Sequence, residues 1–227
     1  MKNMLLFFFS HRTLALLRWD IHFMGVRLRN ALFGHHKVID RFFKTDGPKY
    51  LNLGSGPRGK VDSTWLNIDG YPDKNVHYFC DFSRPMPVPD NSLDGIFTEH
   101  VVEHFDYDHG RDLLAQCFRM LKKGGVIRII VPHGRTFMKA YFDEPDRIVK
   151  YKECETGQPM EAVNKWFYQR YEHQCIYDAP YLTDLLLKLG FSKAYEVGYR
   201  TTQTGSDALL LDDQKYAWES LYVEAVR

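Results

Sequence analysis

The residues best suited to bind a small ligand lie between Lys49 and Asp69. A short apolar run leads into a glycine turn and a second apolar run, in the order Tyr50-Leu51-Asn52-Leu53, Gly54-Ser55-Gly56-Pro57-Arg58-Gly59 and Trp65-Leu66-Asn67-Ile68-Asp69. This order predicts a strand, a turn, a second strand and an acid at its end. A glycine turn lets a ligand approach the backbone, and a carboxylate there can accept both hydroxyls of a ribose. The stretch therefore predicts a site for a nucleotide-like ligand.

The glycine spacing matches a dinucleotide fingerprint, but the distance to the acid does not. Gly54, Gly56 and Gly59 fit the turns of NAD and FAD sites, where a pyrophosphate lies on a helix N-terminus. Those sites need a crossover helix and an acid roughly 20 residues further on, whereas Asp69 follows Gly59 by ten positions. The phosphate-binding helix is therefore predicted to be truncated or missing. A turn that merely joins two strands is the plainer alternative.

Alternating strand and helix patterns after the turn predict a mostly parallel sheet. Further strands are expected at residues 76–80, 93–98, 126–131, 193–197 and 220–226, with helices at 111–123 and from Asp178 to Leu189. Gly124-Gly125 is predicted to cap the first of these helices. Residues 134–176 hold scattered aromatic side chains and no clean strand. Because they leave the carboxyl end of a central strand, they are predicted to form a lid or acceptor-binding insertion, with a helical excursion around core aromatics as the alternative.

Composition limits the classes of protein that the chain can represent. Its 227 residues support one sizeable domain, and a net charge of +1 argues against a general nucleic-acid binder. The four cysteines show neither CxxC nor metal-like spacing, so no metal site is predicted. A reducing cytosol is the simplest setting for such cysteines.

The N-terminal region differs from the rest in charge and pattern. Residues 1–50 hold nine Lys or Arg against three acids, and apolar residues recur at helical spacing at Leu14, Leu17, Ile21, Met24, Leu28 and Leu32. This predicts an amphipathic helix over residues 12–33. One interpretation packs the helix on the domain that follows. The other places residues 1–33 on the anionic inner membrane surface, with residues 5–9 as an anchor; residues 4–9 are too short to span a bilayer.

Four motifs in order and at family spacing resemble the class I S-adenosylmethionine-dependent methyltransferases, and in particular a small bacterial subset common in cell-surface sugar and small-molecule pathways. The motifs are Leu51-Asn52-Leu53-Gly54-Ser55-Gly56, Leu66-Asn67-Ile68-Asp69, the stretch from Pro89 to His104, and Met120-Leu121-Lys122-Lys123-Gly124-Gly125. The resemblance covers about residues 48–227. It implies a Rossmann-like, doubly wound α/β fold with seven mostly parallel strands and an antiparallel last strand. Residues 1–47 would then be a basic helical extension before a methyltransferase domain at 48–227.

The resemblance also implies a binding mode for S-adenosylmethionine. The cofactor residues that it indicates are Gly54, Ser55 and Gly56 at the methionine part, Asp69 at the ribose, Asp81 and Phe82 at the adenine, and Thr98 and Glu99 at the methyl end. None of these roles needs a phosphate-binding helix, so the short link to Asp69 suits this cofactor better than NAD. Asp81 could alternatively be a strand-end cap that bonds its own loop.

Two histidines are the candidates for a general base. His100 follows the strand at residues 93–98, and His133 stands where the family commonly has a small polar or acidic residue after the proline of the fifth strand. Either could take a proton from an acceptor hydroxyl, although His133 could equally be an exposed loop residue. Glu103-His104 is interpreted as a pair that fixes a turn.

The predicted function is O-methylation of a small hydroxylated acceptor, such as a sugar or a cell-surface glycan precursor, with lid aromatics stacking on the acceptor. Methyl transfer is a displacement at an activated carbon, so the protein mainly aligns the reactants. Two alternatives stay open. One is an NAD-linked oxidoreductase, and the other is a non-catalytic methyltransferase-like scaffold in a glycan-assembly complex.

Overall fold

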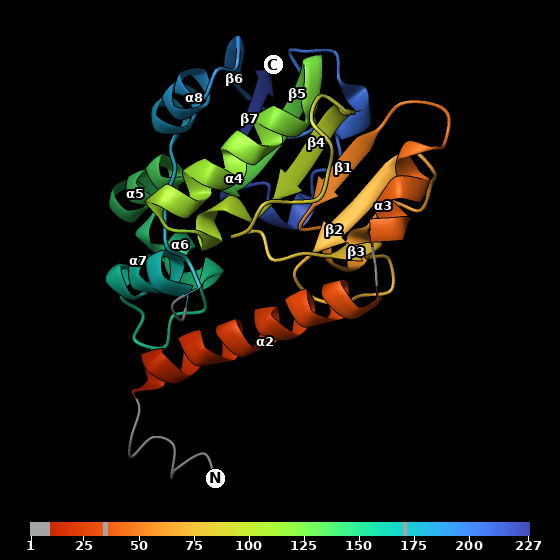
Figure 1. Cartoon of the computed structure of the whole chain (residues 1–227). Coiled ribbons are helices and arrows are strands. Elements are labelled where there is room, and N and C mark those ends of the chain that lie inside the picture. The colour runs from red at the N-terminus through yellow and green to blue at the C-terminus, as the bar shows by residue number, and fades with distance from the viewer. Residues whose placement is uncertain (1–9, 34–35, 170–171) are drawn as a thin grey trace.

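The computed structural model describes residues 10–33, 36–169 and 172–227, and its centre is a seven-stranded sheet (Figure 1). The strand order is β3-β2-β1-β4-β5-β7-β6, and β7 runs antiparallel to both of its neighbours while β1 to β5 are parallel. The predicted fold class is therefore confirmed. The strands are β1 (Tyr50–Leu53), β2 (Trp65–Asp69), β3 (Tyr78–Phe79), β4 (Leu93–Glu99), β5 (Leu121–Pro132), β6 (Lys193–Val197) and β7 (Ser220–Val226).

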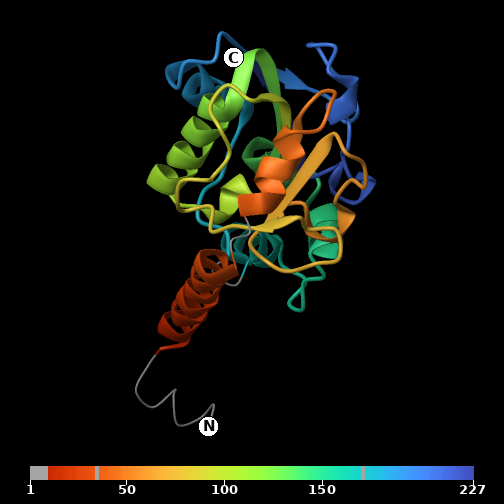
Figure 2. The ribbon, with the colours of Figure 1, turned by 45° about the vertical axis from the view of Figure 1, so that its right-hand side comes forward.

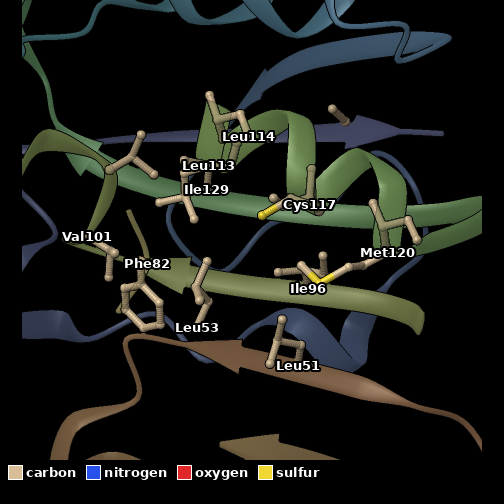
Figure 3. Packing of buried hydrophobic residues seen from close by; sticks show 14 of the residues in the cluster. Leu51, Leu53, Phe82, Ile96, Val101, Leu113, Leu114, Cys117, Met120 and Ile129 are labelled. Carbon is tan, nitrogen blue, oxygen red and sulfur yellow. The ribbon is translucent and has the colours of Figure 1, made fainter. Parts of the chain in front are cut away.

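One face of the sheet carries the main hydrophobic core. The helices that cover it are α3 (His36–Phe43), α4 (Tyr107–Met120) and α8 (Ala179–Lys188). Alternate residues of each strand point to this face, and Figure 3 shows Leu51, Leu53 and Ile96 of the strands beneath Leu113 and Cys117 of α4. All five side chains are fully buried, so the positions of the strand ends are set by close packing.

The opposite face is covered by an irregular segment rather than by long helices. Residues 198–216, which include η4 (Asp207–Leu209) and η5 (Gln214–Tyr216), pack there against Trp65, Phe97 and Tyr222. Arg128 of β5 holds the segment: its guanidinium is fully buried and donates to Asp212, Glu224 and the carbonyls of residues 198 and 201. A buried cation with every partner in place can anchor a chain that has little regular structure of its own.

The link between β1 and β2 contains no α-helix. Only η1 (Gly56–Arg58), a three-residue 3₁₀ helix, follows the glycine turn, which confirms the predicted loss of a phosphate-binding helix. Position 59 requires glycine for a reason unrelated to a phosphate site. A Cβ there would lie 2.7 Å from the Asn67 side chain and 2.8 Å from the Asn75 carbonyl.

Several predicted boundaries are wrong. The fourth helix begins at Tyr107, where Asp106 caps it by accepting from the His109 N–H, and it ends at Met120 instead of residue 123. Gly124-Gly125 lies inside β5, at an irregularity of the β4–β5 ladder, and caps no helix. From Leu121 the chain instead pairs with β4, with Leu121 opposite Leu93 and Lys122 Nζ 2.8 Å from Asp94. The third strand is also shorter than predicted, covering two residues of the expected five.

The segment after β5 forms a small helical unit. It contains α5 (Gly134–Asp143), α6 (Pro145–Tyr151) and α7 (Pro159–Tyr168), which share a core of their own. Phe137 and Trp166 stack at its centre with ring centroids 4.6 Å apart, and both are buried. These two aromatic side chains fill a core and are not available to stack on an acceptor, contrary to the predicted role of lid aromatics.

Helix α2 (His11–Phe33) runs along the edge of the sheet at which the parallel strands end (Figure 1). It contacts the domain through Trp19, His22, Phe23 and Val26, with the His22 ring stacked 4.3 Å from Tyr71. The predicted apolar stripe points the other way: the side chains of residues 17, 21, 24, 28 and 32 are 44% to 69% exposed. Figure 2 shows the N-terminal part of α2 projecting from the body of the domain. The proposed anchor at residues 5–9 lies outside the described residues.

Candidate active site

All the predicted cofactor residues lie at one edge of the sheet. Gly54, Ser55 and Gly56 follow β1, Asp69 ends β2, Asp81 and Phe82 follow β3, and Thr98 and Glu99 end β4. The strands β3, β2, β1 and β4 are neighbours and parallel, so their carboxyl ends meet. This edge is where open α/β sheets bind ligands.

The glycine turn is built around Asp69. The Gly56 N–H donates to one Asp69 oxygen and the Tyr71 N–H donates to the other, each at 2.8 Å. Gly54 has φ +73° and lies so close to Val101 that a Cβ would approach its methyl group to 2.1 Å. No other residue type fits at position 54 without displacing β4's following turn. Asp69 is thus fixed in place, with lone pairs left over for a ligand.

Two buried hydroxyls in this region are candidates to meet a ligand. Among the described residues, Ser55 Oγ and Thr98 Oγ1 have no hydrogen-bond partner, although both are buried. Buried polar atoms are rarely left without a partner. Gly56, at φ +49°, would direct a Cβ into open space. These features fit a group that enters against the glycine turn.

A cavity of about 280 Å³ opens beside the turn. Gly54, Ser55 and Glu99 contribute to its wall, together with the basic side chains of Arg58 and Arg200. Burial raises the pKa of Glu99, with the Asp213 N–H and the Arg58 charge acting in the opposite direction. Arg58 pairs with Glu99 at 3.0 Å, so the cavity offers both charges that a zwitterionic amino acid requires.

Asp81, which is predicted to bind adenine, is held by the N-terminal helix. Asp81 is buried and forms an ion pair with Arg27 of α2, while its other oxygen accepts from Ser83 N and Oγ at 3.1 and 2.6 Å. The bonds to Ser83 are those of a loop cap, the alternative foreseen for Asp81. Phe82 is buried in the main core. An adenine amino group would therefore have to share Asp81 with Arg27 or replace it.

A second cavity, of about 230 Å³, lies beyond β4 and contains His100. Nδ1 of His100 donates to Glu103 Oε1 at 3.0 Å, and its Nε2 lies 3.1 Å from Ser220 Oγ. The Tyr216 ring lies 4.5 Å from the imidazole. His100 has φ +54°, a conformation that a non-glycine residue keeps only where the surroundings enforce it.

The pair of His100 and Glu103 has the geometry of an oriented base. Burial raises the pKa of Glu103, but the hydrogen bond and charge of His100 outweigh it, so the pKa is lowered and the group is a carboxylate. Burial alone would lower the pKa of His100, yet Glu103 raises it overall. A carboxylate on Nδ1 fixes the tautomer, so Nε2 carries the lone pair and accepts from the Ser220 hydroxyl. An acceptor hydroxyl would have to replace Ser220 at this nitrogen.

His133 lies apart from this pair. It precedes α5, its Nδ1 lies 2.8 Å from Thr136 Oγ1, and it does not line the cavity that holds His100. Burial lowers the pKa of His133. The structure does not bring the two predicted bases together, and the role of His133 as a base stays a prediction.

Several residues of the site were missed by sequence reasoning. Ser220 and Tyr216 reach His100 from the far end of the chain, and Arg27 reaches Asp81 from the N-terminal helix. No local pattern marks such contacts. Glu103 was read as a residue that fixes a turn, and its place three positions after His100 was the available signal for a pair.

The fold and this edge together define a class of protein. Seven strands in this order, with the last antiparallel and a glycine turn after β1, are the Rossmann-like fold of class I methyltransferases. Residues 66–129 match the family model described as methyltransferase domain. No curated protein matches the chain.

Solved structures share this fold at low identity. A methyltransferase from Thermotoga maritima, described as a possible histamine N-methyltransferase, is 15% identical with a TM-score of 0.50 over 92% of this chain and 99% of that chain. A methyltransferase from Archaeoglobus fulgidus is 16% identical with a TM-score of 0.49, over 88% and 94%. Phosphoethanolamine N-methyltransferase 2 from Haemonchus contortus, solved with S-adenosyl-L-methionine, is 15% identical with a TM-score of 0.48, over 86% and 52%.

In its strand order, and over residues 66–129 in its sequence, the chain is similar to the class I S-adenosylmethionine-dependent methyltransferases. It is an enzyme of methyl transfer, and S-adenosylmethionine is its cofactor. Among the residues that the structure describes, no helix has both the length and the apolar character needed to cross a membrane.

Proposed function

We propose that this methyltransferase methylates a hydroxyl oxygen of a small polar acceptor, such as a sugar or a glycan precursor. The observation that carries the proposal is the pair of His100 and Glu103, which stands at the carboxyl end of β4 next to the predicted cofactor residues Thr98 and Glu99. An oriented imidazole has a clear use in methylating a hydroxyl, since the proton must leave the oxygen.

Different residues at the carboxyl ends of the strands would bind different parts of S-adenosylmethionine. Gly54, Ser55 and Gly56 would face the methionine part, and Asp69 would accept both ribose hydroxyls. S-adenosylmethionine supplies a methyl group activated by a positive sulfonium. Arg58 and Glu99 would bind the carboxylate and the ammonium group of its methionine part.

The chemistry needs one proton acceptor. The acceptor oxygen forms a bond to the methyl carbon as the carbon–sulfur bond breaks, and the hydroxyl proton passes to His100 Nε2. The products are a methyl ether and S-adenosylhomocysteine. Glu103 stabilises the imidazolium that results, and such a positioned base contributes about 10²- to 10⁴-fold in rate.

The lining of the second cavity supports a polar acceptor. Lys152, Gln169, Tyr216 and Glu219 surround it along with His100. Hydrogen-bonding side chains suit hydroxyl groups, and the Tyr216 ring offers an apolar surface for the carbon face of a sugar. Tyr216 takes the stacking role that the sequence interpretation gave to aromatics of residues 134–176.

Calorimetry with S-adenosylhomocysteine and with NAD tests the cofactor half of the proposal. We expect stoichiometric binding of the former and none of the latter, because the β1–β2 link has no helix for a pyrophosphate. Turnover with glycan-precursor acceptors tests the rest, and His100→Ala should reduce the rate constant by about 10²-fold or more. Absence of turnover across such acceptors, with cofactor binding intact, would favour the scaffold alternative.

We further propose that α2 rests on an anionic membrane at the cytoplasmic side. Its apolar stripe points away from the domain, and Arg18 is exposed beside the stripe, whereas Arg29 stacks over the Phe79 ring of the domain. Apolar side chains in line with basic neighbours are typical of helices that lie in the interface of anionic bilayers. Such a position would suit an acceptor that is linked to a lipid.

Sedimentation with vesicles tests the membrane contact. We expect the protein to bind vesicles rich in phosphatidylglycerol and not those of phosphatidylcholine, and Ile21→Glu combined with Leu28→Glu to abolish binding. Phe142→Glu is the matched control, because Phe142 is 78% exposed on α5 and away from α2. A dimer in solution that the double variant dissociates would show instead that the stripe binds a second copy.

A further inference from the structure

Glu103, which orients His100 in the reaction proposed above, also lies beside two histidines that this reaction does not use. Glu103 and His104 belong to η2 (Val102–His104), and His173 lies in the segment before α8. One ligand atom from each lies within 4.8 Å of the others, and the two imidazole rings lie 5.3 Å apart at 71°. All three residues line the cavity that holds His100.

Both histidines have the same ring nitrogen occupied by a backbone carbonyl. His104 Nδ1 lies 3.0 Å from the Glu172 carbonyl, and His173 Nδ1 lies 2.8 Å from the Trp166 carbonyl. A carbonyl oxygen can only accept, so each Nδ1 carries the hydrogen. In both rings the lone pair is therefore on Nε2. This is the outer hydrogen bond that orients histidines at metal centres.

Only one of the two carboxylate oxygens of Glu103 has a hydrogen-bond partner. Its Oε1 accepts from His100, while Oε2 has no hydrogen-bond partner among the described residues, although the side chain is only 1% exposed. A buried carboxylate oxygen without a donor is costly. A single metal cation would satisfy all three groups. It would bind Glu103 Oε2 and accept the Nε2 lone pairs of His104 and His173.

We propose that Glu103, His104 and His173 bind a divalent transition-metal ion. Two imidazole nitrogens and one carboxylate oxygen suit ions such as zinc, and three protein ligands leave a coordination position open, as in catalytic zinc sites. No metal site was predicted from the sequence, because that prediction considered cysteine spacing and these ligands are distant along the chain.

The position of the site gives the ion a use that rests on the proposed function. Glu103 bonds His100 through one oxygen and would bind the ion through the other, so base and ion share one carboxylate. A metal ion at its open position binds hydroxyl oxygens and lowers their pKa. It would thus hold the acceptor hydroxyl next to the base.

Zinc titration of the chelator-treated full chain tests the site. We expect one zinc ion per protein by calorimetry, and visible absorption bands when cobalt replaces zinc. His104→Ala and His173→Ala should each weaken zinc binding at least about 10-fold, since even outer-shell changes cost about 10- to 100-fold. The control is His109→Ala, because His109 also lies beside a carboxylate, that of Asp106, but on the exposed surface.

Two outcomes would overturn the inference. One is the absence of stoichiometric zinc binding, and the other is equal affinity in the His104→Ala variant and the His109→Ala control. Thermal unfolding in the presence of chelator first shows whether each variant is as stable as the wild type. As a second readout, zinc should raise the Tm of the wild type but not that of His173→Ala. S-adenosylhomocysteine binding is measured in parallel with chelator present. If it binds while zinc does not, only the metal site fails; if zinc binds while it does not, only the proposed function fails.

Discussion

Replacement of Asp69 by alanine is the strongest test of the cofactor site, because its effects on ligand affinity and on stability can both be worked out. The carboxylate would accept two ribose hydroxyls, and a hydrogen bond to a charged group contributes about 1.5 to 3 kcal/mol. Loss of both bonds therefore costs about 3 to 6 kcal/mol, which weakens S-adenosylhomocysteine binding by roughly 10² to 10⁴-fold.

The same change releases two backbone donors. The N–H groups of Gly56 and Tyr71 lose bonds of 2.8 Å each, and since Asp69 is only half-buried, water replaces part of what is lost. We expect a loss of about 1 to 2 kcal/mol in stability, or roughly 2 to 8 °C in Tm for a chain of this size. Calorimetry is therefore run well below the Tm of the variant.

Two further variants separate the ribose contact from general damage. Asp69→Asn keeps one acceptor oxygen but turns an amide N–H₂ toward one backbone donor, so we expect a similar loss of Tm and an intermediate affinity. Asp73→Ala, an exposed acid in the same β2–β3 connection, should change neither quantity. A folded Asp69→Ala protein that binds S-adenosylhomocysteine within about threefold of the wild type, against the 10²-fold expected, would refute the assignment of Asp69.

Two further predictions concern long-range contacts, and a third concerns a buried histidine. Arg27→Ala frees Asp81 from a partly exposed ion pair of about 1 kcal/mol, so calorimetry should show S-adenosylhomocysteine affinity raised by up to about fivefold; weaker binding would mean that Arg27 helps to hold the ligand. Arg128→Met leaves the buried Asp212 without its partner, and denaturant unfolding should show a loss of about 3 to 5 kcal/mol; a loss below about 1 kcal/mol would contradict the anchoring role. Burial lowers the pKa of His133, so its contribution to stability is present above about pH 6.5 and is lost as the pH falls. His133→Gln should therefore show a smaller fall in Tm than the wild type between about pH 7.5 and pH 5.5, and an equal fall would assign the effect elsewhere.

Local sequence patterns predicted the parts of the molecule that local physics determines. The short link between Gly59 and Asp69 leaves no room for a helix, and the structure has only η1 there. The predicted helix end at residue 123 was wrong because the chain pairs with β4 from Leu121 onward, a contact between segments far apart in sequence that local signals do not reveal. The anchoring role of Arg128 was not foreseen at all, since its partners follow it by 70 or more residues.

The N-terminal helix shows a different limit of sequence reasoning. The helical spacing of its apolar residues identified an apolar stripe, but this spacing does not predict whether the stripe packs on the domain or faces away from it. The domain instead contacts a second face that carries His22, Phe23 and Arg27, and mixed polar and aromatic residues produce no simple period. The histidine pair at 104 and 173 was likewise invisible, because two residues far apart in sequence meet only in the folded chain.

The contact of Arg27 with Asp81 has a thermodynamic consequence if α2 rests on a bilayer as proposed. If adenine displaces Arg27, cofactor binding weakens the hold of the domain on α2, and by reciprocity anything that draws α2 away strengthens cofactor binding by the same factor. Helix position and cofactor occupancy would then be linked equilibria. Because S-adenosylmethionine and S-adenosylhomocysteine carry the same adenine, occupancy of the site by either would influence how the enzyme is distributed between bilayer and solution. The lipid surface would in turn change the affinity for both.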